Sequence, residues 1–265
     1  MENKSKELEV AMQAALEAGK IVEKHFETEL IHEVKDDKSI VTIADKESEE
    51  IIKKIILTAF PQHSILGEET GLTQNGNDYV WHIDPIDGTR NFANGIPLFS
   101  VSIALENKGE IVIGVIYNPA TKTIFYAEKG KGAYCNGSRI FVSKNDESHS
   151  IITASGNKSK EDKKFLLDFY YHIQQGAIKM RYFGCTALDL AYVAKGSTEA
   201  TIQLGWSTYD YAAGTILVQE AGGVITTFNG EKWKFPDAYF IASNGVFHDL
   251  LISEVQKQKA KLNLV

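Results

Sequence analysis

The sequence predicts an α+β first half followed by an α/β second half, and three patterns support this fold class. Residues 5–26 and 42–59 each place apolar side chains at helical spacing. Residues 99–142 contain short apolar runs separated by turns, which predicts an antiparallel meander. From residue 151 onward, strand-like runs alternate with helix-like stretches, as they do in α/β proteins.

The first half opens with a predicted helix over residues 5–26, and a charged, exposed loop follows over 32–39. Thr42 is placed to cap the second helix, which ends before Pro61. Residues 64–69 are a predicted short strand that finishes in acidic side chains. The rest of this half comprises a polar turn (71–78), a buried strand (79–83) and meander strands at 99–105, 111–117, 123–127 and 139–142, with a hairpin turn at Lys108-Gly109.

The second half alternates between the two kinds of element, and a polar stretch over residues 143–150 separates it from the meander. We therefore predict two parts, 1–147 and 148–265. The predicted strands of the second half are 151–154, 177–183, 200–204 and 239–242, and the predicted helices are 160–174, 187–194, 209–221 and 247–257.

Composition limits the class of protein. A chain of 265 residues with 43% hydrophobic and 24% charged residues suits one large globular domain or two small ones. The net charge of −7 argues against nucleic acid as the main partner, although a bound metal would still admit an anionic substrate. Cys135 and Cys185 have no metal or redox spacing, which indicates a reducing cytoplasm. The start lacks an apolar signal core and no apolar run has the length of a membrane span, so we expect a cytoplasmic protein without a membrane partner.

The stretch from Tyr79 to Thr89 organises the rest of the chain. Its apolar strand delivers two carboxylates, Asp84 and Asp87, to the carboxyl end, where Pro85 should stop strand pairing. Around this proline turn both carboxylates and the carbonyl of Ile86 can face one point. Such an all-oxygen site suits a hard cation, Mg²⁺ more naturally than Zn²⁺.

The residues after this turn predict an anion cradle. The amides of Gly88 and Thr89 would open a helix, where backbone N–H groups attract phosphate. Metal-binding carboxylates beside a phosphate cradle indicate phosphoryl chemistry.

Other acidic residues have simpler explanations when each is taken alone. Asp210 could be a helix N-cap and Asp45 an acidic residue in a first helical turn. Glu68 and its acidic neighbour could be solvated surface. We interpret His82 as a core or cleft-wall residue, because an oxygen site does not need imidazole.

Four stretches nevertheless form an ordered set that spans almost the whole chain. They are Gly67-Glu68-Glu69-Thr70, Trp81-His82-Ile83-Asp84-Pro85-Ile86-Asp87-Gly88-Thr89, Gly130-Lys131-Gly132-Ala133-Tyr134-Cys135-Asn136-Gly137, and Tyr209-Asp210-Tyr211-Ala212-Ala213-Gly214 running to Glu220-Ala221-Gly222-Gly223. In order and approximate spacing this set resembles the Mg²⁺-dependent, lithium-sensitive inositol monophosphatase family. The second and fourth stretches together are highly specific.

The resemblance implies a layered αβαβα sandwich of the inositol monophosphatase and fructose-1,6-bisphosphatase type, a homodimer, and a site between the two halves. It implies hydrolysis of inositol monophosphate to inositol and phosphate, with two or three Mg²⁺ ions per site. The implied metal ligands are Glu68, Asp84, Asp87, Asp210 and the carbonyl of Ile86. The implied water-activating residues are Thr89 and Asp45, together with Glu68. The implied substrate contacts are Gly88, Thr89, Thr186, Ala187, Gln203 and Asp210, with Lys35 and Arg90 as further candidates.

Three positions depart from the family pattern. Tyr209 stands where a tryptophan is usual, and the loop that holds Lys35 is a residue shorter than in animal members. Gln203 stands where inositol-preferring members have a glutamate that contacts the sugar ring. Because an amide accepts fewer and weaker hydrogen bonds than a carboxylate, and because Arg90 follows the phosphate turn, broader specificity is a second hypothesis. Its substrates would include NADP, an adenosine bisphosphate or fructose bisphosphate.

Two readings outside this family stay open from the residues alone. Residues 84–89 resemble the Asp-x-Asp-Gly-Thr loop of haloacid-dehalogenase phosphatases, but two residues separate the aspartates instead of one. A non-catalytic Ca²⁺-binding module is the other alternative, although the chain lacks alternating oxygen ligands in a twelve-residue loop.

Overall fold

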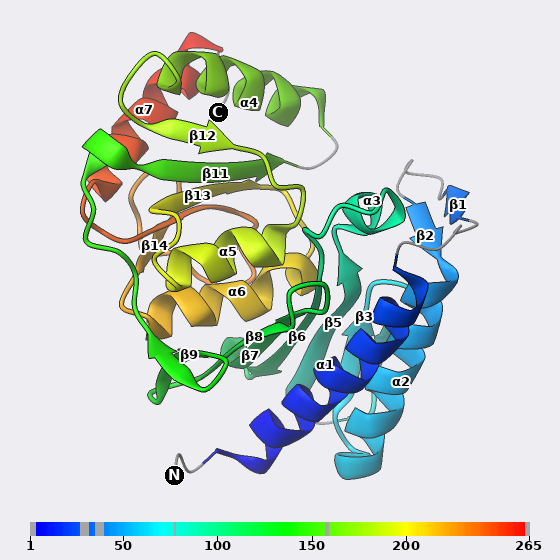
Figure 1. The fold of residues 1–265 in the computed structure, drawn as a ribbon. Helices are drawn as coiled ribbons and strands as arrows, with labels where there is room; N and C mark the ends of the chain where they lie inside the picture. The colour runs from blue at the N-terminus through cyan, green and yellow to red at the C-terminus, as the bar shows by residue number, and fades with distance from the viewer. Residues whose placement is uncertain (1–3, 27–31, 35–39, 77, 157–158, 263–265) are drawn as a thin grey trace.

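The computed structural model describes residues 4–26, 32–34, 40–76, 78–156 and 159–262, which form five layers in the order α, β, α, β, α (Figure 1). The first layer is α1 (Lys6–His25) and α2 (Ile43–Ala59), which pack side by side on one face of a large sheet. The Ser5 hydroxyl accepts a hydrogen bond from the Leu8 amide at the start of α1. Both helices begin and end within two residues of their predicted bounds.

The second layer is an eight-stranded sheet in the order β10-β9-β8-β7-β6-β5-β3-β4. Strands β3 and β5 are parallel, and the other described neighbours are antiparallel. Lys108 and Gly109 have φ angles of 53° and 83°, so the predicted hairpin turn is confirmed. The strands are β3 (Ser64–Gly67), β4 (Gly71–Thr73), β5 (Tyr79–Asp87), β6 (Ser100–Asn107), β7 (Glu110–Asn118), β8 (Thr123–Glu128), β9 (Gly132–Cys135) and β10 (Ser138–Ile140).

The third layer, α5 (Thr186–Ala194) and α6 (Thr208–Glu220), lies between the two sheets (Figure 1). Both helices are buried on nearly every side, because each must cover a sheet above and below. Two glycines permit the close contacts. A Cβ on Gly114 of β7 would lie 2.4 Å from the Ala213 carbonyl of α6, and one on Gly214 would lie 2.4 Å from Leu190 of α5.

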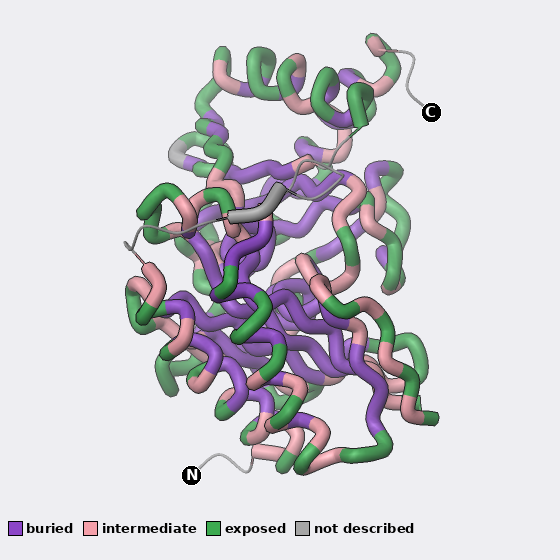
Figure 2. The backbone as a smooth tube through the Cα atoms, turned by 90° about the vertical axis from the view of Figure 1, so that its right-hand side faces the viewer, coloured by how far each residue is buried: buried purple, intermediate pink, exposed green. Residues whose placement is uncertain are grey.

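The fourth and fifth layers come from the second half of the chain. The five-stranded sheet has the order β12-β11-β13-β15-β14, with β12, β11 and β13 parallel and the other two antiparallel to their neighbours. Its outer face is covered by the exposed helices at the top of Figure 2, α4 and α7. The elements are β11 (Ile151–Gly156), α4 (Lys160–Ile173), β12 (Lys179–Arg181), β13 (Ala200–Leu204), β14 (Val224–Thr226), β15 (Tyr239–Ser243) and α7 (His248–Lys261).

Several short elements differ from the prediction. The predicted loop 32–39 begins with β1 (His32–Val34), which pairs with β2 (Ile40–Thr42), and β4 lies inside the predicted polar turn. Strands β9 and β14 were also missed, because runs of three or four residues carry little periodicity. The connection between the sheets holds a short 3₁₀ turn, η1 (Glu147–His149), at the predicted boundary of the two parts. Within the described residues, no helix has the length and apolar character needed to cross a membrane.

Candidate active site

Three carboxylates meet where the two halves of the chain face each other. Asp84 and Asp87 come from the carboxyl end of β5, and Asp210 comes from the first turn of α6. Each offers one oxygen, and these oxygens all lie within 4.8 Å of one another. The structure therefore brings together three of the predicted metal ligands. The first and last of them, Asp84 and Asp210, are 126 residues apart in the sequence (210 − 84).

The end of β5 is irregular, and this irregularity turns both aspartates toward one point. Asp84 pairs with Ser102 and Asp87 pairs with Ser100, with a register shift between them at Pro85. The prediction that pairing stops at the proline is thus correct only locally, because pairing resumes at Asp87. One Asp84 oxygen accepts the Ile86 amide at 3.0 Å, which fixes the turn.

Asp210 is held by a capping box at the start of α6. Ser207 is the N-cap residue, and its amide donates to an Asp210 oxygen at 2.8 Å. The interpretation of Asp210 itself as the N-cap is wrong, because the carboxylate sits three residues inside that cap. Its second oxygen is left for the cluster.

The carboxylates of the cluster are buried close together and repel one another. Burial raises the pKa of Asp84 well above its usual value, and the charges of Glu68, Asp87 and Asp210 raise it further. Burial also raises the pKa of Asp87 to about 6, against hydrogen bonds that favour its charged form, and raises that of Asp210. A site that gathers only oxygen acceptors and repels its own charges fits a hard divalent cation.

Glu68 joins this cluster from the turn after β3, close enough to raise the pKa of Asp84. The turn is fixed by Glu49 of α2, a fully buried carboxylate that accepts the Glu69 amide at 2.8 Å and the Thr70 amide at 3.1 Å. A Cβ on Gly67 would lie 2.4 Å from a Glu49 oxygen, so a larger residue there would displace this carboxylate.

Thr89 and Asp45 lie within reach of each other, as the resemblance implies. The Thr89 hydroxyl is 3.4 Å from an Asp45 oxygen and 2.9 Å from the Ile86 carbonyl, which is its closer acceptor. Asp45 is fully buried, and this burial raises its pKa to about 7 although Thr42 donates two hydrogen bonds to it. A carboxylate with this pKa can exchange a proton near neutral pH.

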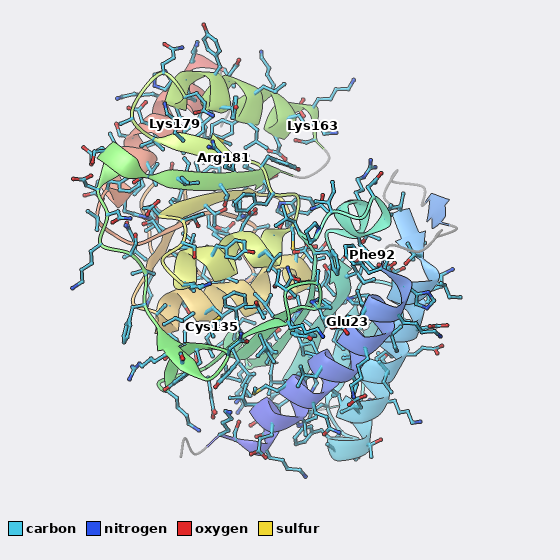
Figure 3. All side chains as sticks on the ribbon, in the orientation of Figure 1. Glu23, Phe92, Cys135, Lys163, Lys179 and Arg181 are labelled. Atoms are coloured by element: carbon cyan, nitrogen blue, oxygen red, sulfur yellow. The ribbon has the colours of Figure 1, made fainter. Side chains whose placement is uncertain are left out.

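The turn after β5 opens a helix, as predicted. Gly88 has a φ angle of 87° and is the N-cap residue of α3 (Thr89–Ala93). A Cβ there would lie 2.9 Å from the Leu98 carbonyl and 3.2 Å from the Gly184 carbonyl, so only glycine fits. Phe92, labelled in Figure 3, anchors the inner side of this short helix against Phe99.

The start of α5 supports Asp87 from the other side. The Ala187 amide donates to an Asp87 oxygen at 2.5 Å, and the Cys185 thiol lies 3.2 Å from the same oxygen. Thr186 and Ser155 share a hydrogen bond of 3.1 Å between their hydroxyls. The predicted substrate residues Thr186 and Ala187 thus lie beside the cluster, and the Ala187 amide is already engaged there.

Gln203 is a buried residue of β13 with both ends of its amide hydrogen-bonded. Its exposed fraction is 0%, its carbonyl oxygen accepts from Ser155, and its amide nitrogen donates to Thr201 at 2.7 Å. Gln203 thus lies in β13 between these two hydroxyls, and its contact with a substrate stays a prediction. Arg90 is exposed on α3, and Lys35 falls outside the described residues.

Sequence reasoning missed three supporting residues, Glu49, Cys185 and Ser207. The serine could have been found, because Ser-x-x-Asp before an apolar run is a capping signal. The other two act through contacts distant in sequence, which no local pattern reveals.

In Figure 3 the labelled cations Lys163, Lys179 and Arg181 lie on α4 and β12, on the far side of the molecule from α1 and α2.

A five-layer α/β sandwich with a cluster of carboxylates at the junction of its halves is the arrangement that the family resemblance implied. Comparison with known proteins agrees with that resemblance: residues 3–260 match the inositol monophosphatase family, and the chain belongs to it. A relative from Aquifex aeolicus, named fructose-1,6-bisphosphatase/inositol-1-monophosphatase, is 37% identical over 97% of this chain and 98% of its own.

Two further similarities agree with this assignment. The Nus factor SuhB of Pseudomonas aeruginosa is 35% identical over 94% of this chain and 95% of its own. The solved structure of the inositol monophosphatase TM1415 from Thermotoga maritima superposes with a TM-score of 0.89 at 33% identity, covering 97% of this chain and 100% of the other. The layered fold that the resemblance implied is thereby confirmed.

Proposed function

We propose that this protein is a Mg²⁺-dependent phosphomonoesterase that hydrolyses inositol monophosphate to inositol and phosphate. The observation that carries the proposal is the convergence of Asp84, Asp87 and Asp210 at the junction of the two halves. Their pKa values are raised by burial and mutual repulsion, so a divalent cation would be bound strongly there.

The residues that would hold Mg²⁺ are Glu68, Asp84, Asp87, Asp210 and the carbonyl of Ile86. We propose two or three ions per site. Bound Mg²⁺ would supply charge stabilisation for the phosphoryl group and a water of lowered pKa.

The protein's own groups would position the substrate and take up the proton. The Thr89 hydroxyl orients the attacking water, and the Asp45 carboxylate, with its pKa of about 7, accepts a proton through it. Glu68 is the second candidate acceptor. The amides of Gly88 and Thr89 would stabilise the charge that develops on the phosphoryl group. Because water itself attacks phosphorus and the ester P–O bond breaks to release inositol, no covalent intermediate is required.

The alternative within the family is broader specificity. The Aquifex relative carries both a fructose-1,6-bisphosphatase and an inositol-1-monophosphatase name. Gln203 stands where inositol-preferring members have a glutamate, and its buried amide is already bonded to Ser155 and Thr201, which favours broader specificity. Exposed Arg90 beside the site would suit a second anionic group, as in NADP, an adenosine bisphosphate or fructose bisphosphate.

The test is a phosphate-release assay of the full chain over inositol phosphates, NADP, 2′-AMP, adenosine bisphosphate and fructose bisphosphate, with Mg²⁺ and with chelator. We expect hydrolysis of inositol monophosphate only with Mg²⁺. Full activity in chelator, or trapping of a phosphoaspartate on Asp84, would overturn the mechanism. Arg90→Ala should lower kcat/KM for the larger anions more than for inositol monophosphate.

The homodimer implied by the resemblance is part of the proposal. Analytical sedimentation of the full chain checks its oligomeric state.

A further inference from the structure

A hydrogen-bonded chain of Glu106, His82 and Thr208, with a buried ring between two half-buried ends, crosses the junction between the two halves. His82 lies on β5, two residues before Asp84, and is 4% exposed. Its Nε2 is 2.9 Å from a Glu106 oxygen on β6, and its Nδ1 is 2.8 Å from the Thr208 hydroxyl on α6. The chain therefore links the strand that carries two cluster carboxylates to the helix that carries the third.

The geometry gives each group a defined role. The carboxylate of Glu106 can only accept, so it takes the Nε2–H, and in the neutral ring Nδ1 is left to accept from Thr208. The hydrogen bond from His82 lowers the pKa of Glu106, and the Gly109 amide donates to the second Glu106 oxygen at 3.0 Å. The ring edge also packs against Phe235, with centroids 5.4 Å apart. Both ring nitrogens are thus engaged, which excludes His82 as a metal ligand in this arrangement.

The far end of the chain lies next to the third carboxylate. Thr208 is the first residue of α6 and Asp210 is the third. A second bond ties the same turn to β6, since the Ser102 hydroxyl donates to the Tyr209 carbonyl at 3.1 Å. Two consecutive residues before Asp210 are therefore anchored to the sheet that presents Asp84 and Asp87.

We propose that Glu106, His82 and Thr208 are positioning residues that set the divalent-cation affinity of the site by fixing Asp210 relative to Asp84 and Asp87. This inference rests on the proposed metal binding. Groups that only orient metal ligands change metal affinity by ~10–100-fold when they are altered, and a hydroxyl two residues from a ligand acts in the same way.

The test replaces the Thr208 hydroxyl without changing its shape. Thr208→Val should weaken Mg²⁺ binding to the substrate-free protein by about 10-fold, measured by calorimetry and by the Mg²⁺-induced shift in unfolding temperature. Thr208→Ser keeps the hydroxyl and should restore wild-type affinity. Thr215→Val is the matched control, because that buried hydroxyl on the same helix donates to the Ala212 carbonyl within its own helix and has no other partner among the described residues. It should lower the unfolding temperature without changing the Mg²⁺ affinity.

A double-mutant cycle with Glu106→Ala tests whether the three residues act as one unit. If they do, Thr208→Val and Glu106→Ala together should cost little more Mg²⁺ affinity than either alone. Unchanged affinity in Thr208→Val, an equal loss in Thr215→Val, or fully additive effects would overturn the inference. Because binding is measured without substrate, a protein that hydrolyses no phosphate ester but loses Mg²⁺ affinity in Thr208→Val would contradict the proposed function alone.

Discussion

At the scale of single residues, Asp87 is held between opposing influences. The start of α5 donates hydrogen bonds to its carboxylate, while burial and neighbouring charges raise its pKa. Such a group is costly to the metal-free fold, which agrees with the ligand role that we propose for it.

Asp87→Asn tests separately the proposed metal-ligand role of this residue and the cost of its buried charge to the fold. We expect kcat/KM to fall by more than about 100-fold, since changes to mere supporting groups already cost ~10–100-fold. We also expect the metal-free protein to become more stable at pH 8 by about 1–3 kcal/mol, because the amide keeps an acceptor for the Ala187 amide and removes a buried charge. Denaturant unfolding in chelator checks this, with Asp168→Asn on α4 as the control. A loss of stability in Asp87→Asn would contradict the account of the cluster.

Thr89 is the residue whose role is chemical in our proposal. Thr89→Ala should lower kcat by about 100-fold while KM changes only a few-fold, because the hydroxyl orients the water and binds no part of the leaving group. Steady-state kinetics with saturating Mg²⁺ measure both constants, and Thr89→Ser should retain most of the activity. A change confined to KM would make Thr89 a substrate-binding residue and Glu68 the better base.

The sequence was informative for residues whose role lies in a local motif. Asp84 and Asp87 belong to one stretch, and their meeting could be predicted from the proline turn alone, whereas the pairing of Thr89 with Asp45 followed only from the family resemblance. Gln203 shows the limit of this reasoning, because its place in a predicted strand does not say whether the side chain is exposed or packed in the interior. The burial of Gln203 depends on Ser155 and Thr201, which the strand pattern does not place around it.

At the scale of elements, one face of α2 supplies two buried acidic side chains to the site. Asp45 and Glu49 are four residues apart, so both point toward the sheet, one to Thr89 and the other to the turn that holds Glu68. The helix itself could be predicted from its cap and periodicity, but the use of its buried acids could not.

Glu49→Gln tests this second function of the helix. An amide nitrogen cannot accept a hydrogen bond, so at least one donor of the turn loses its partner, at a cost of about 1–3 kcal/mol in the free energy of unfolding. We also expect kcat/KM to fall, because the turn carries Glu68. Glu50→Gln, an exposed neighbour on the same helix, should change stability by less than about 0.5 kcal/mol. Equal effects of the two substitutions would remove the argument for Glu49.

At the scale of the whole molecule, the raised pKa values couple stability to pH. Asp45 and Asp87 have pKa values of about 7 and about 6 in the fold, well above the usual value near 3.8 that the unfolded chain keeps. Between about pH 4 and pH 7 the folded protein therefore holds protons that the unfolded chain has released, and its stability falls as pH rises.

Mg²⁺ should reverse this trend. In chelator, the free energy of unfolding should decrease from pH 5 to pH 8, on the order of 1.4 kcal/mol for each unit by which a carboxyl pKa is raised. With saturating Mg²⁺ the carboxylates are ionised in the fold, so the stabilisation by Mg²⁺ should be larger at pH 8 than at pH 5. Thermal unfolding under the four conditions measures this. A Mg²⁺ effect that is equal at both pH values would contradict the role of the cluster.

The general architecture could also be predicted at this scale, but not the way in which its layers meet. Alternating elements indicated the second sheet, and the meander indicated the first. The antiparallel addition of β15 and β14 to a parallel core was not predicted, because βα alternation leaves strand direction open. The site itself depends on that meeting of layers, since Asp210 reaches Asp84 only when α6 lies on the first sheet.

The middle layer limits how this protein can be truncated or recombined. Helix α6 belongs to the second half in sequence, yet it covers the strands of the first, pressed against them where Gly114 leaves no room for a side chain. A fragment ending at residue 147 would present that bare apolar sheet face to water and should aggregate when expressed alone. Chimeras that join halves from different relatives should also fold poorly. The point of joining would divide a core to which both halves contribute, so the packed side chains would no longer match.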